Sequence, residues 1–363
     1  MKHTLTLLTA LLLTAPYLSR AENPASTATP PKGNDGAALL KLFPDADTDK
    51  DGALSLPEKL AYIQANPKVR PFLAALAGGK AGAKGPRVTP PGERSTPDSA
   101  ALPAGPQVFV CAHSFMIFTG LMLPPMTEAA GIAYRDAGTQ MIGGSRAIQH
   151  WNVPDERNLA KKALCEGTVD VLLLSPNILV PDEGIDHFVK LGLEKNPNLR
   201  VLVQASWPGW DGKFGQFKNA ERDAMTQATL TTMKERYQAA WLTPLEAQVA
   251  TLNASLGKPV VGIVPVSSAV FALRERIAQG TAPGLTKQTD LFRDDIGHAL
   301  PPLAALVSYC HFAVIHRRSP VGLPVPATLK NLPEAEKLNT LLQELAWQAV
   351  TSYPASGLKD SAK

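Results

Sequence analysis

The sequence predicts an α/β protein whose larger part is a three-layer α/β/α domain with a central parallel sheet. Four short apolar runs recur along the chain, at residues 107–112, 169–175, 199–206 and 259–266, and each has the length of one buried strand. Segments with apolar residues at helical spacing separate these runs. Strands that alternate with helices form parallel sheets covered by helices on both faces. A small helical module is expected ahead of this domain, at residues 36–76, where short helical segments flank an acidic loop.

The first 21 residues have the pattern of a secretory signal peptide. A basic start precedes an apolar stretch from Leu5 to Leu13 and the small-x-small sequence Ser19, Arg20, Ala21. The apolar stretch is too short to cross a bilayer as a helix. We therefore expect an exported protein, periplasmic or secreted, that begins near Glu22 and has no membrane span.

Charge and cysteine content narrow the class of protein. The formal net charge of +4 becomes +2 once Lys2 and Arg20 leave with the predicted signal. So small an excess on a chain of this length argues against nucleic acid as the partner. The three cysteines, Cys111, Cys165 and Cys310, leave at least one free thiol, and the sequence leaves open whether two of them pair.

A change in composition marks the predicted domain boundary. Residues 77–106 are rich in Gly, Pro and small side chains, which bury little apolar surface. We expect a linker there, between the module at 36–76 and a main domain at 107–350.

Three helical segments are predicted in the second half of the main domain. Residues 218–256 keep apolar side chains at helical spacing, with a break near Thr243 and Pro244. The last two helices are predicted at 303–315 and 333–350.

The acidic loop of the N-terminal module has the pattern of an EF-hand calcium site. Its twelve residues, DTDKDGALSLPE, place carboxylates at alternating positions, a Gly at the sharp turn and a Glu at the end that can bind with both oxygens. The predicted calcium ligands are Asp47, Asp49, Asp51, the carbonyl of Ala53, Ser55 and Glu58. The alternative is an acidic surface turn. No second loop follows, so we expect weak, structural binding on the order of 10⁻⁴ to 10⁻³ M.

A serine, a histidine and an aspartate occupy positions where an α/β domain gathers its chemistry. Ser114 follows the 107–112 run, and ligands of open parallel sheets bind at the carboxyl ends of strands. His298 ends the sequence DDIGH, with Asp295 three residues before it. A carboxylate on the same turn can orient an imidazole that activates a serine hydroxyl. The residues therefore predict Ser114 as nucleophile, His298 as base and Asp295 as orienting carboxylate, with Asp294 as the second choice.

A serine after the first strand and an Asp-x-x-His before the final helices resemble the SGNH (GDSL-like) hydrolases, over about residues 107–320. The resemblance implies a flavodoxin-like three-layer fold and ester hydrolysis without a cofactor, so that calcium would serve only the EF-hand. IGGSR is similar to the family's glycine block, which would make the Gly144 N–H an oxyanion donor beside that of Ser114. LSPNI falls at the asparagine block, which would make Asn177 the third donor.

The chain also departs from the SGNH pattern. The family's Gly-Asp-Ser is Ala112, His113 and Ser114 here, and the Gly-x-Asn-Asp block is absent around Asn177. The whole is similar to a group of exported bacterial proteins with the same His-Ser-Phe start and Asp-x-x-His end.

Each candidate also has a structural interpretation. Ser114 could cap the helix that follows it, His298 could be a satisfied core histidine, and Asn177 could be a turn residue. His311 and His316 are predicted to be structural, because residues five apart on a helix do not share a face well.

Trp151, Trp207 and Trp210 bear on the substrate. If these rings are exposed, they could stack on sugars, and a carbohydrate ester becomes the natural substrate. Buried packing is the alternative.

The sequence thus predicts an exported serine esterase of SGNH type with a calcium-binding EF-hand, acting on a small-molecule or carbohydrate ester such as an acetylated sugar. One alternative is a catalytically inactive, calcium-binding protein that binds carbohydrate or another partner on a hydrolase fold. Another is an acyl transferase that moves an acetyl group between sugars.

Overall fold

A computed structural model of the chain describes residues 102–358 together with residues 47, 48, 50, 62 and 87–89. The chain divides into two compact units, Met1–Asn34 and Asp35–Lys363, and all described residues belong to the second.

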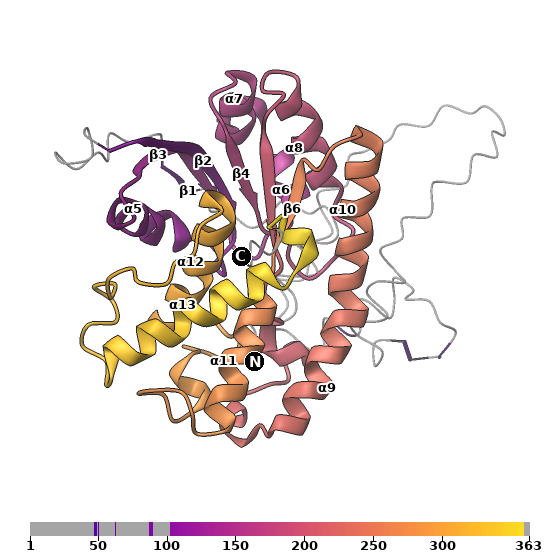
Figure 1. Cartoon of the computed structure of the whole chain (residues 1–363). Helices are drawn as coiled ribbons and strands as arrows, with labels where there is room; N and C mark the ends of the chain where they lie inside the picture. The colour runs from indigo at the N-terminus through magenta and orange to yellow at the C-terminus, as the bar shows by residue number, and fades with distance from the viewer. Residues whose placement is uncertain (1–46, 49, 51–61, 63–86, 90–101, 359–363) are drawn as a thin grey trace, which may run out of the picture. The chain divides into compact units, whose positions relative to one another are not determined.

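A six-stranded sheet runs through this second unit (Figure 1). Its order is β1 (Arg87–Thr89), β3 (Ala133–Met141), β2 (Ala104–Ala112), β4 (Val171–Leu174), β5 (Arg200–Gln204) and β6 (Val261–Val264). Five strands are parallel, and only β1 pairs antiparallel, along the outer edge of β3. In order of occurrence, the parallel strands read 2-1-3-4-5, which is the flavodoxin-like order. The sheet therefore reverses its direction of growth between β2 and β4.

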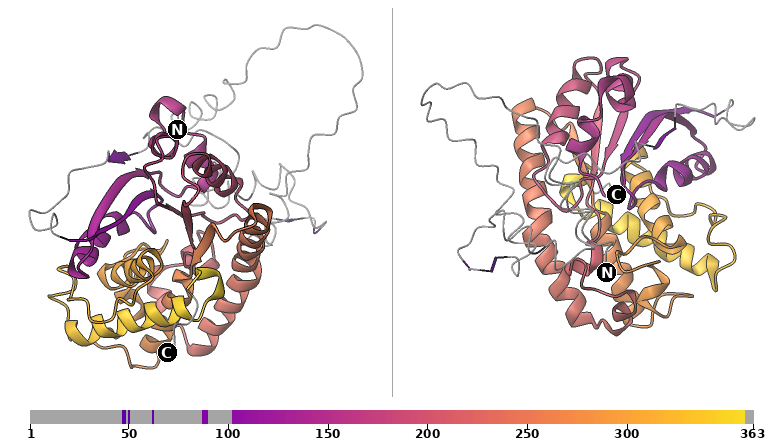
Figure 2. Two further views of the ribbon diagram at one scale, coloured as in Figure 1. Left: turned by 45° about the horizontal axis from the view of Figure 1, so that its top comes forward. Right: turned by 180° about the vertical axis from the view of Figure 1, so that it is seen from behind.

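Helices cover both faces of the sheet (Figures 1 and 2). One core forms with α5 (Thr119–Ala129), α11 (Val266–Ala278), α12 (Pro301–His316) and α13 (Ala335–Thr351). The core on the other face forms with α6 (Ala147–Trp151), α7 (Leu159–Cys165), α8 (Glu183–Leu193) and α10 (Thr243–Leu256). The predicted three-layer α/β/α fold with a central parallel sheet is confirmed.

The central strand shows why both faces need a cover. Val108 and Val110 of β2 pack into the first core, whereas Phe109 and Cys111 pack into the second. Successive side chains of a strand point to opposite faces, so a continuous apolar run requires helices on both sides.

The four apolar runs form β2, β4, β5 and β6, but β1 and β3 had no such signal. β3 carries Arg135 and Asp136 in its first half and is only partly buried. A search for continuous apolar runs therefore misses it, because a strand near the sheet edge needs fewer apolar residues.

The predicted linker at 77–106 overlaps the sheet. β1 lies within that range, and β2 begins at Ala104 rather than at residue 107. The Val and Thr of β1 suit an extended strand, and their pairing with β3 places them in the main domain.

The predicted long helical segment is divided. A 3₁₀ turn (Asn219–Ala224) precedes α9 (Gln227–Tyr237), a π-helical turn (Gln238–Leu242) follows, and α10 begins at Thr243. Pro244 falls in the first turn of α10, where its missing N–H removes no helical hydrogen bond. The break was predicted at this position.

Of the helices in the described part of the chain, none combines the length and the hydropathy that a bilayer-spanning segment requires.

Candidate active site

Ser114 lies two residues beyond the carboxyl end of β2, at the sheet's switch point. It begins a tight turn in which the His113 carbonyl accepts the N–H groups of Met116 and Ile117, both at 3.0 Å. No side chain caps the helix that follows, whose N-cap is Phe118. The Ser114 hydroxyl lies 2.9 Å from Nε2 of His298 instead. The helix-capping interpretation of Ser114 is therefore wrong.

His298 is oriented by Asp294. Nδ1 of His298 lies 2.7 Å from Oδ2 of Asp294, and the other carboxylate oxygen accepts the N–H groups of Gly297 at 3.0 Å and His298 at 3.2 Å. Gly297 has a φ of 97°, which a residue with a side chain rarely adopts. The carboxylate thus closes the turn that carries the histidine.

Asp295 does not take the role predicted for it. Its Oδ1 accepts the N–H of Asn219 at 2.9 Å, and its Oδ2 lies 3.3 Å from Nζ of Lys218. The prediction assumed a helical turn, but residues 292–299 form a tight reversal closed by a bridge between Phe292 and Ala299. The orienting carboxylate is Asp294.

These contacts fix the proton positions. A carboxylate can only accept, so Nδ1 of His298 donates to Asp294 and the lone pair of Nε2 faces the Ser114 hydroxyl. Partial burial acts to raise the pKa of Asp294, but hydrogen bonds from the His298 ring and from the His298 and Gly297 N–H groups lower it overall. Asp294 is therefore ionised at neutral pH, as a partner of an imidazolium must be.

A second backbone donor at this cavity comes from the turn after β3. Gly144 follows β3 by three residues and has a φ of 63°. In the part of the chain that the structure describes, the N–H groups of Ser114 and Gly144 donate to no protein acceptor. Both residues line one cavity with His298. They are available to a developing oxyanion.

Asn177 stands beside these donors, three residues after β4. Its Nδ2 donates to the Gly144 carbonyl at 2.8 Å, and it lines the cavity that contains Ser114. One amide hydrogen thus holds the turn that contains Gly143 and Gly144, which we call the glycine turn. The second amide hydrogen is available to the cavity. Asn177 is more than a turn residue.

The buried His150 supports the glycine turn through Ser145. Nδ1 of His150 faces the side-chain amide of Gln140 at 3.2 Å, and its Nε2 lies 2.9 Å from Oγ of Ser145. Burial lowers the pKa of His150 to about 3, with the charge of His113 contributing. The neutral ring therefore accepts from Gln140 and donates to Ser145, which fixes the residue that follows Gly144.

His113, next to Ser114 in the chain, is also a buried histidine that holds its neighbours through hydrogen bonds. Its Nδ1 accepts the N–H of Phe115 at 3.2 Å, so its Nε2 donates to Oγ of Ser175 at 2.8 Å. Burial, followed by the charge of His298, lowers the pKa of His113 to about 4. It is a neutral positioning group.

His311 and His316 make structural contacts, as predicted. Nε2 of His311 lies 2.8 Å from Oε1 of Gln204, whose amide donates to the Phe115 carbonyl at 3.1 Å. His316 pairs with the Thr127 hydroxyl at 3.1 Å.

The sequence did not indicate that two buried residues hold the turn at residues 294–298, which we call the histidine turn. The Trp207 indole N–H donates to the Gly297 carbonyl at 3.0 Å, and its ring stacks on Phe115, with centroids 4.5 Å apart. The Arg222 guanidinium donates to the carbonyls of Asp294 and Asp295, each at 3.0 Å. Both come from segments distant in sequence, so no local spacing of residues predicts their contacts with the turn.

Arg222 is itself fixed by a buried ion cluster. Oδ1 of Asp211 lies 3.3 Å from Nε of Arg222, and Oδ2 lies 2.7 Å from Arg274. All three side chains are at most 1% exposed. The cluster ties the histidine turn to α11.

The tryptophans do not form a sugar-stacking surface. Trp207 and Trp210 are each only 2% exposed. Trp151 stacks on His187 of α8 and lines neither of the two cavities at the site. For Trp207 and Trp210, buried packing is the correct interpretation.

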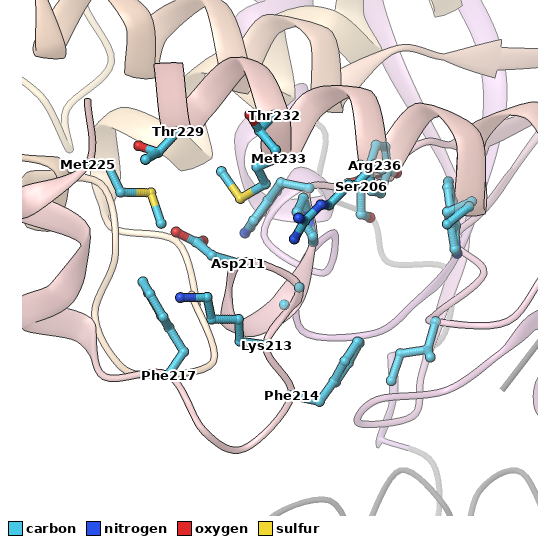
Figure 3. A pocket seen from close by; sticks show the side chains of 18 of the residues that line it. Ser206, Asp211, Lys213, Phe214, Phe217, Met225, Thr229, Thr232, Met233 and Arg236 are labelled. Carbon is cyan, nitrogen blue, oxygen red and sulfur yellow. Dashed lines mark hydrogen bonds between the residues drawn. The ribbon is translucent and has the colours of Figure 1, made fainter. Parts of the chain in front are cut away.

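Two adjoining cavities open at the site. One of about 330 Å³ includes Ser114, Gly144 and His298 in its lining. The other, of about 990 Å³, lies between α9 and the loop after β5 (Figure 3). They share lining residues, among them Phe115, Asn177 and Phe214, and therefore lie side by side.

The predicted EF-hand lies almost wholly outside the described residues, and of its predicted ligands only Asp47 is among them. Among the residues that the structure does describe, no three His, Cys, Asp or Glu side chains gather as a metal site would require. The predicted signal peptide also lies outside the described residues.

No family model matches the chain, and no curated protein matches it. A DUF4886 family protein from Bacteroides uniformis is similar to it at 15% sequence identity, over 69% of this chain and 96% of that one, with a TM-score of 0.47.

Proposed function

We propose that this protein is a serine esterase that works through an acyl-enzyme. The observation that carries the proposal is the chain of contacts from Ser114 through His298 to Asp294, with distances of 2.9 Å and 2.7 Å. These lie within the range for proton transfer between nucleophile, base and orienting group. Support also comes from the site's place at the carboxyl ends of the strands, where flavodoxin-like folds bind ligands.

The first half of the reaction forms the acyl-enzyme. The Ser114 hydroxyl loses its proton to Nε2 of His298 as its oxygen bonds to the ester carbonyl carbon, and the carbonyl oxygen takes the negative charge. Asp294 stabilises the imidazolium. The N–H groups of Ser114 and Gly144 and the second amide hydrogen of Asn177 would stabilise the oxyanion. The ester C–O bond then breaks, and His298 gives its proton to the leaving alkoxide.

The second half releases the acid. Water gives a proton to His298 and attacks the acyl carbon, and the same donors stabilise the second tetrahedral intermediate. Its collapse returns the proton to Ser114. This chemistry needs no cofactor.

Hydrolysis of p-nitrophenyl acetate and butyrate by the purified mature chain tests the proposal. Ser114→Ala and His298→Ala should each lower kcat by about 10³-fold or more. Ser255→Ala, in α10 at the opposite end of the sheet, is the matched serine control. A fluorophosphonate should label Ser114 in the wild type. Folded wild-type protein that neither hydrolyses any ester nor takes up the label would refute the esterase.

We further propose, on the sequence alone, that the mature protein is exported and that its DTDKDGALSLPE loop binds calcium through oxygen ligands. The loop would not take part in the chemistry. Calorimetric titration with Ca²⁺ of the wild type and of Glu58→Gln tests the site, and the variant should bind more weakly. N-terminal sequencing of the exported protein tests cleavage before Glu22.

A further inference from the structure

We propose that the 990 Å³ cavity beside α9 binds one side of the ester substrate, and that this side is bulky, largely apolar and carries an acidic group. The inference rests on the proposed esterase function, since it names the substrate class of the same site. We call this space the α9 cavity.

The size of the α9 cavity argues against an acetyl ester. The cavity around Ser114 has about 330 Å³, enough for the reacting ester and a small acyl group. The adjoining α9 cavity is three times larger and lies at the upper end of the range for drug-sized ligands. A substrate with two small sides would leave most of it filled with water.

The lining of the α9 cavity is mostly apolar. Met233 and Tyr237 of α9, with Ala240 of the π-helical turn that follows, form one wall, and Phe214 and Phe217 of the loop after β5 form the other. Figure 3 shows Met233 on the helix side and Phe214 and Phe217 on the loop side. Trp241 lies at the end of this wall. A flexible Met beside aromatic rings accommodates alkyl or aryl groups of varied shape.

The side of α9 that faces the cavity carries apolar side chains that are only partly buried. Leu230 is the only fully buried residue of α9, and Tyr237 packs partly against the core beside Trp241. Met233 and Tyr237 remain half-buried and face the cavity. An apolar helix face beside an active site is available to a substrate.

Two cations face the α9 cavity. Figure 3 shows Lys213 on the loop side and Arg236 on the helix side. Among the described residues, neither has a carboxylate partner; Lys213 only lies over the Phe217 ring, 5.6 Å from its centroid. They are available to an anion on the substrate.

The acids on the same lining cancel these charges only in part. Asp211 is neutralised by Arg222 and Arg274, which are buried with it. Glu221 is the remaining acid, and its carboxylate accepts the N–H of Lys218 at 2.8 Å. The open part of the cavity therefore favours an acidic over a basic substituent.

A substrate series tests size and identifies the side that the α9 cavity binds. The wild type is assayed with p-nitrophenyl acetate and octanoate for the acyl side, and with ethyl and octyl acetate for the alcohol side. One of the two longer esters should exceed its short partner in kcat/KM by at least about 10-fold, because each buried methylene adds a several-fold preference. The mono-p-nitrophenyl ester of octanedioate or the acetate of 8-hydroxyoctanoate, whichever matches that side, should react better still.

Variants in α9 connect the preference to this cavity. Met233→Trp, which fills the cavity, should reduce the long-to-short ratio of kcat/KM by about 10-fold. Arg236→Gln should reduce the preference for the acidic ester over the neutral one by about fivefold. Thr231→Trp and Lys234→Gln, exposed residues of α9 outside the lining, are the matched controls and should change neither ratio.

The outcomes separate this inference from the esterase itself. Ser114-dependent hydrolysis of the acetates with no preference for either long ester overturns the inference and leaves the esterase standing. So does a long-chain preference that Met233→Trp leaves unchanged. If no ester is hydrolysed, the esterase fails, and titration of Ser114→Ala with octanedioate decides the cavity: binding weakened by Arg236→Gln supports it, and no binding overturns it.

Discussion

Nδ1 of His298 lies 2.7 Å from the carboxylate of Asp294, four residues before it in the same turn. The neighbouring Asp295 points away, to the backbone N–H of Asn219. Two adjacent acids in one sequence motif therefore have different roles: Asp294 orients the catalytic histidine, and Asp295 holds the backbone of a neighbouring segment.

Asp294→Asn should abolish most of the activity, and Asp295→Asn should not. An amide at residue 294 can donate to Nδ1 and favour the wrong tautomer of His298, so we expect kcat/KM to fall by about 10³- to 10⁴-fold. Asp295→Asn should cost less than about 10-fold, because its carboxylate supports the turn from outside. Steady-state kinetics of both variants, with circular dichroism to check folding, make the comparison. Equal losses of kcat/KM in the two variants would contradict the assignment of the orienting role to Asp294 alone.

Sequence spacing could not have chosen between these two acids. DDIGH predicts a carboxylate near His298, but the choice depends on how the backbone turns. The turn at Gly297 brings Asp294 back to the ring, and Arg222 and Trp207 hold the turn from distant segments. Such long-range contacts leave no local pattern in a single sequence.

Asn177→Ala should lower kcat more than it raises KM. The side chain holds the Gly144 carbonyl and offers a second hydrogen to the oxyanion, so we expect kcat to fall by about 10²-fold. Asn177→Asp should be worse, because its carboxylate would face both the Gly144 carbonyl and the developing negative charge. A rise in KM at constant kcat in Asn177→Ala would mean that Asn177 only binds substrate.

Arg222→Gln should destabilise the protein and loosen the site. The substitution removes the partner of two main-chain carbonyls and one of the two cations around Asp211, which is 1% exposed. Breaking a buried pair of this kind costs about 3 kcal/mol or more. Urea unfolding monitored by circular dichroism measures the loss. A change below about 1 kcal/mol would contradict the structural role.

The buried histidines should make the protein unstable in mild acid. Burial lowers the pKa of His113 and His316 to about 4, and of His150 and His311 to about 3. The unfolded chain binds protons at these groups below about pH 6.5, so the free energy of unfolding should fall from there to about pH 4. Asp182, whose pKa burial raises to about 6, acts in the opposite sense but is a single group.

Urea titrations at pH 7.5, 6 and 5 check this slope. His150→Gln removes one of the buried imidazoles and should flatten the dependence, although the variant starts from a lower stability at pH 7.5. An unfolding midpoint that is constant from pH 7.5 to 5 would contradict the prediction.

The fold was easier to predict than the site. Continuous apolar runs identified β2, β4, β5 and β6, because a strand buried on both faces needs apolar residues at every position. β3 escaped, since its Arg135 and Asp136 suit a position close to the sheet edge. Ser114 and His298 were predicted from their places after the first apolar run and before the last helices, whereas Gly144 and Asn177 were predicted only from the resemblance to the SGNH hydrolases. The α9 cavity was not predicted, since its walls come from two segments that meet only in three dimensions.

The short strand β1 affects whether a truncated form of the protein aggregates. It covers the outer edge of β3 with three residues, Arg87 to Thr89, that precede the rest of the sheet by more than a dozen positions. A truncated chain starting near Pro103 would lack this cover, and the bare N–H and C=O groups of β3 could recruit the same edge of another molecule. We expect such a truncation to aggregate during purification, whereas one that keeps Arg87–Thr89 should stay monodisperse in light scattering.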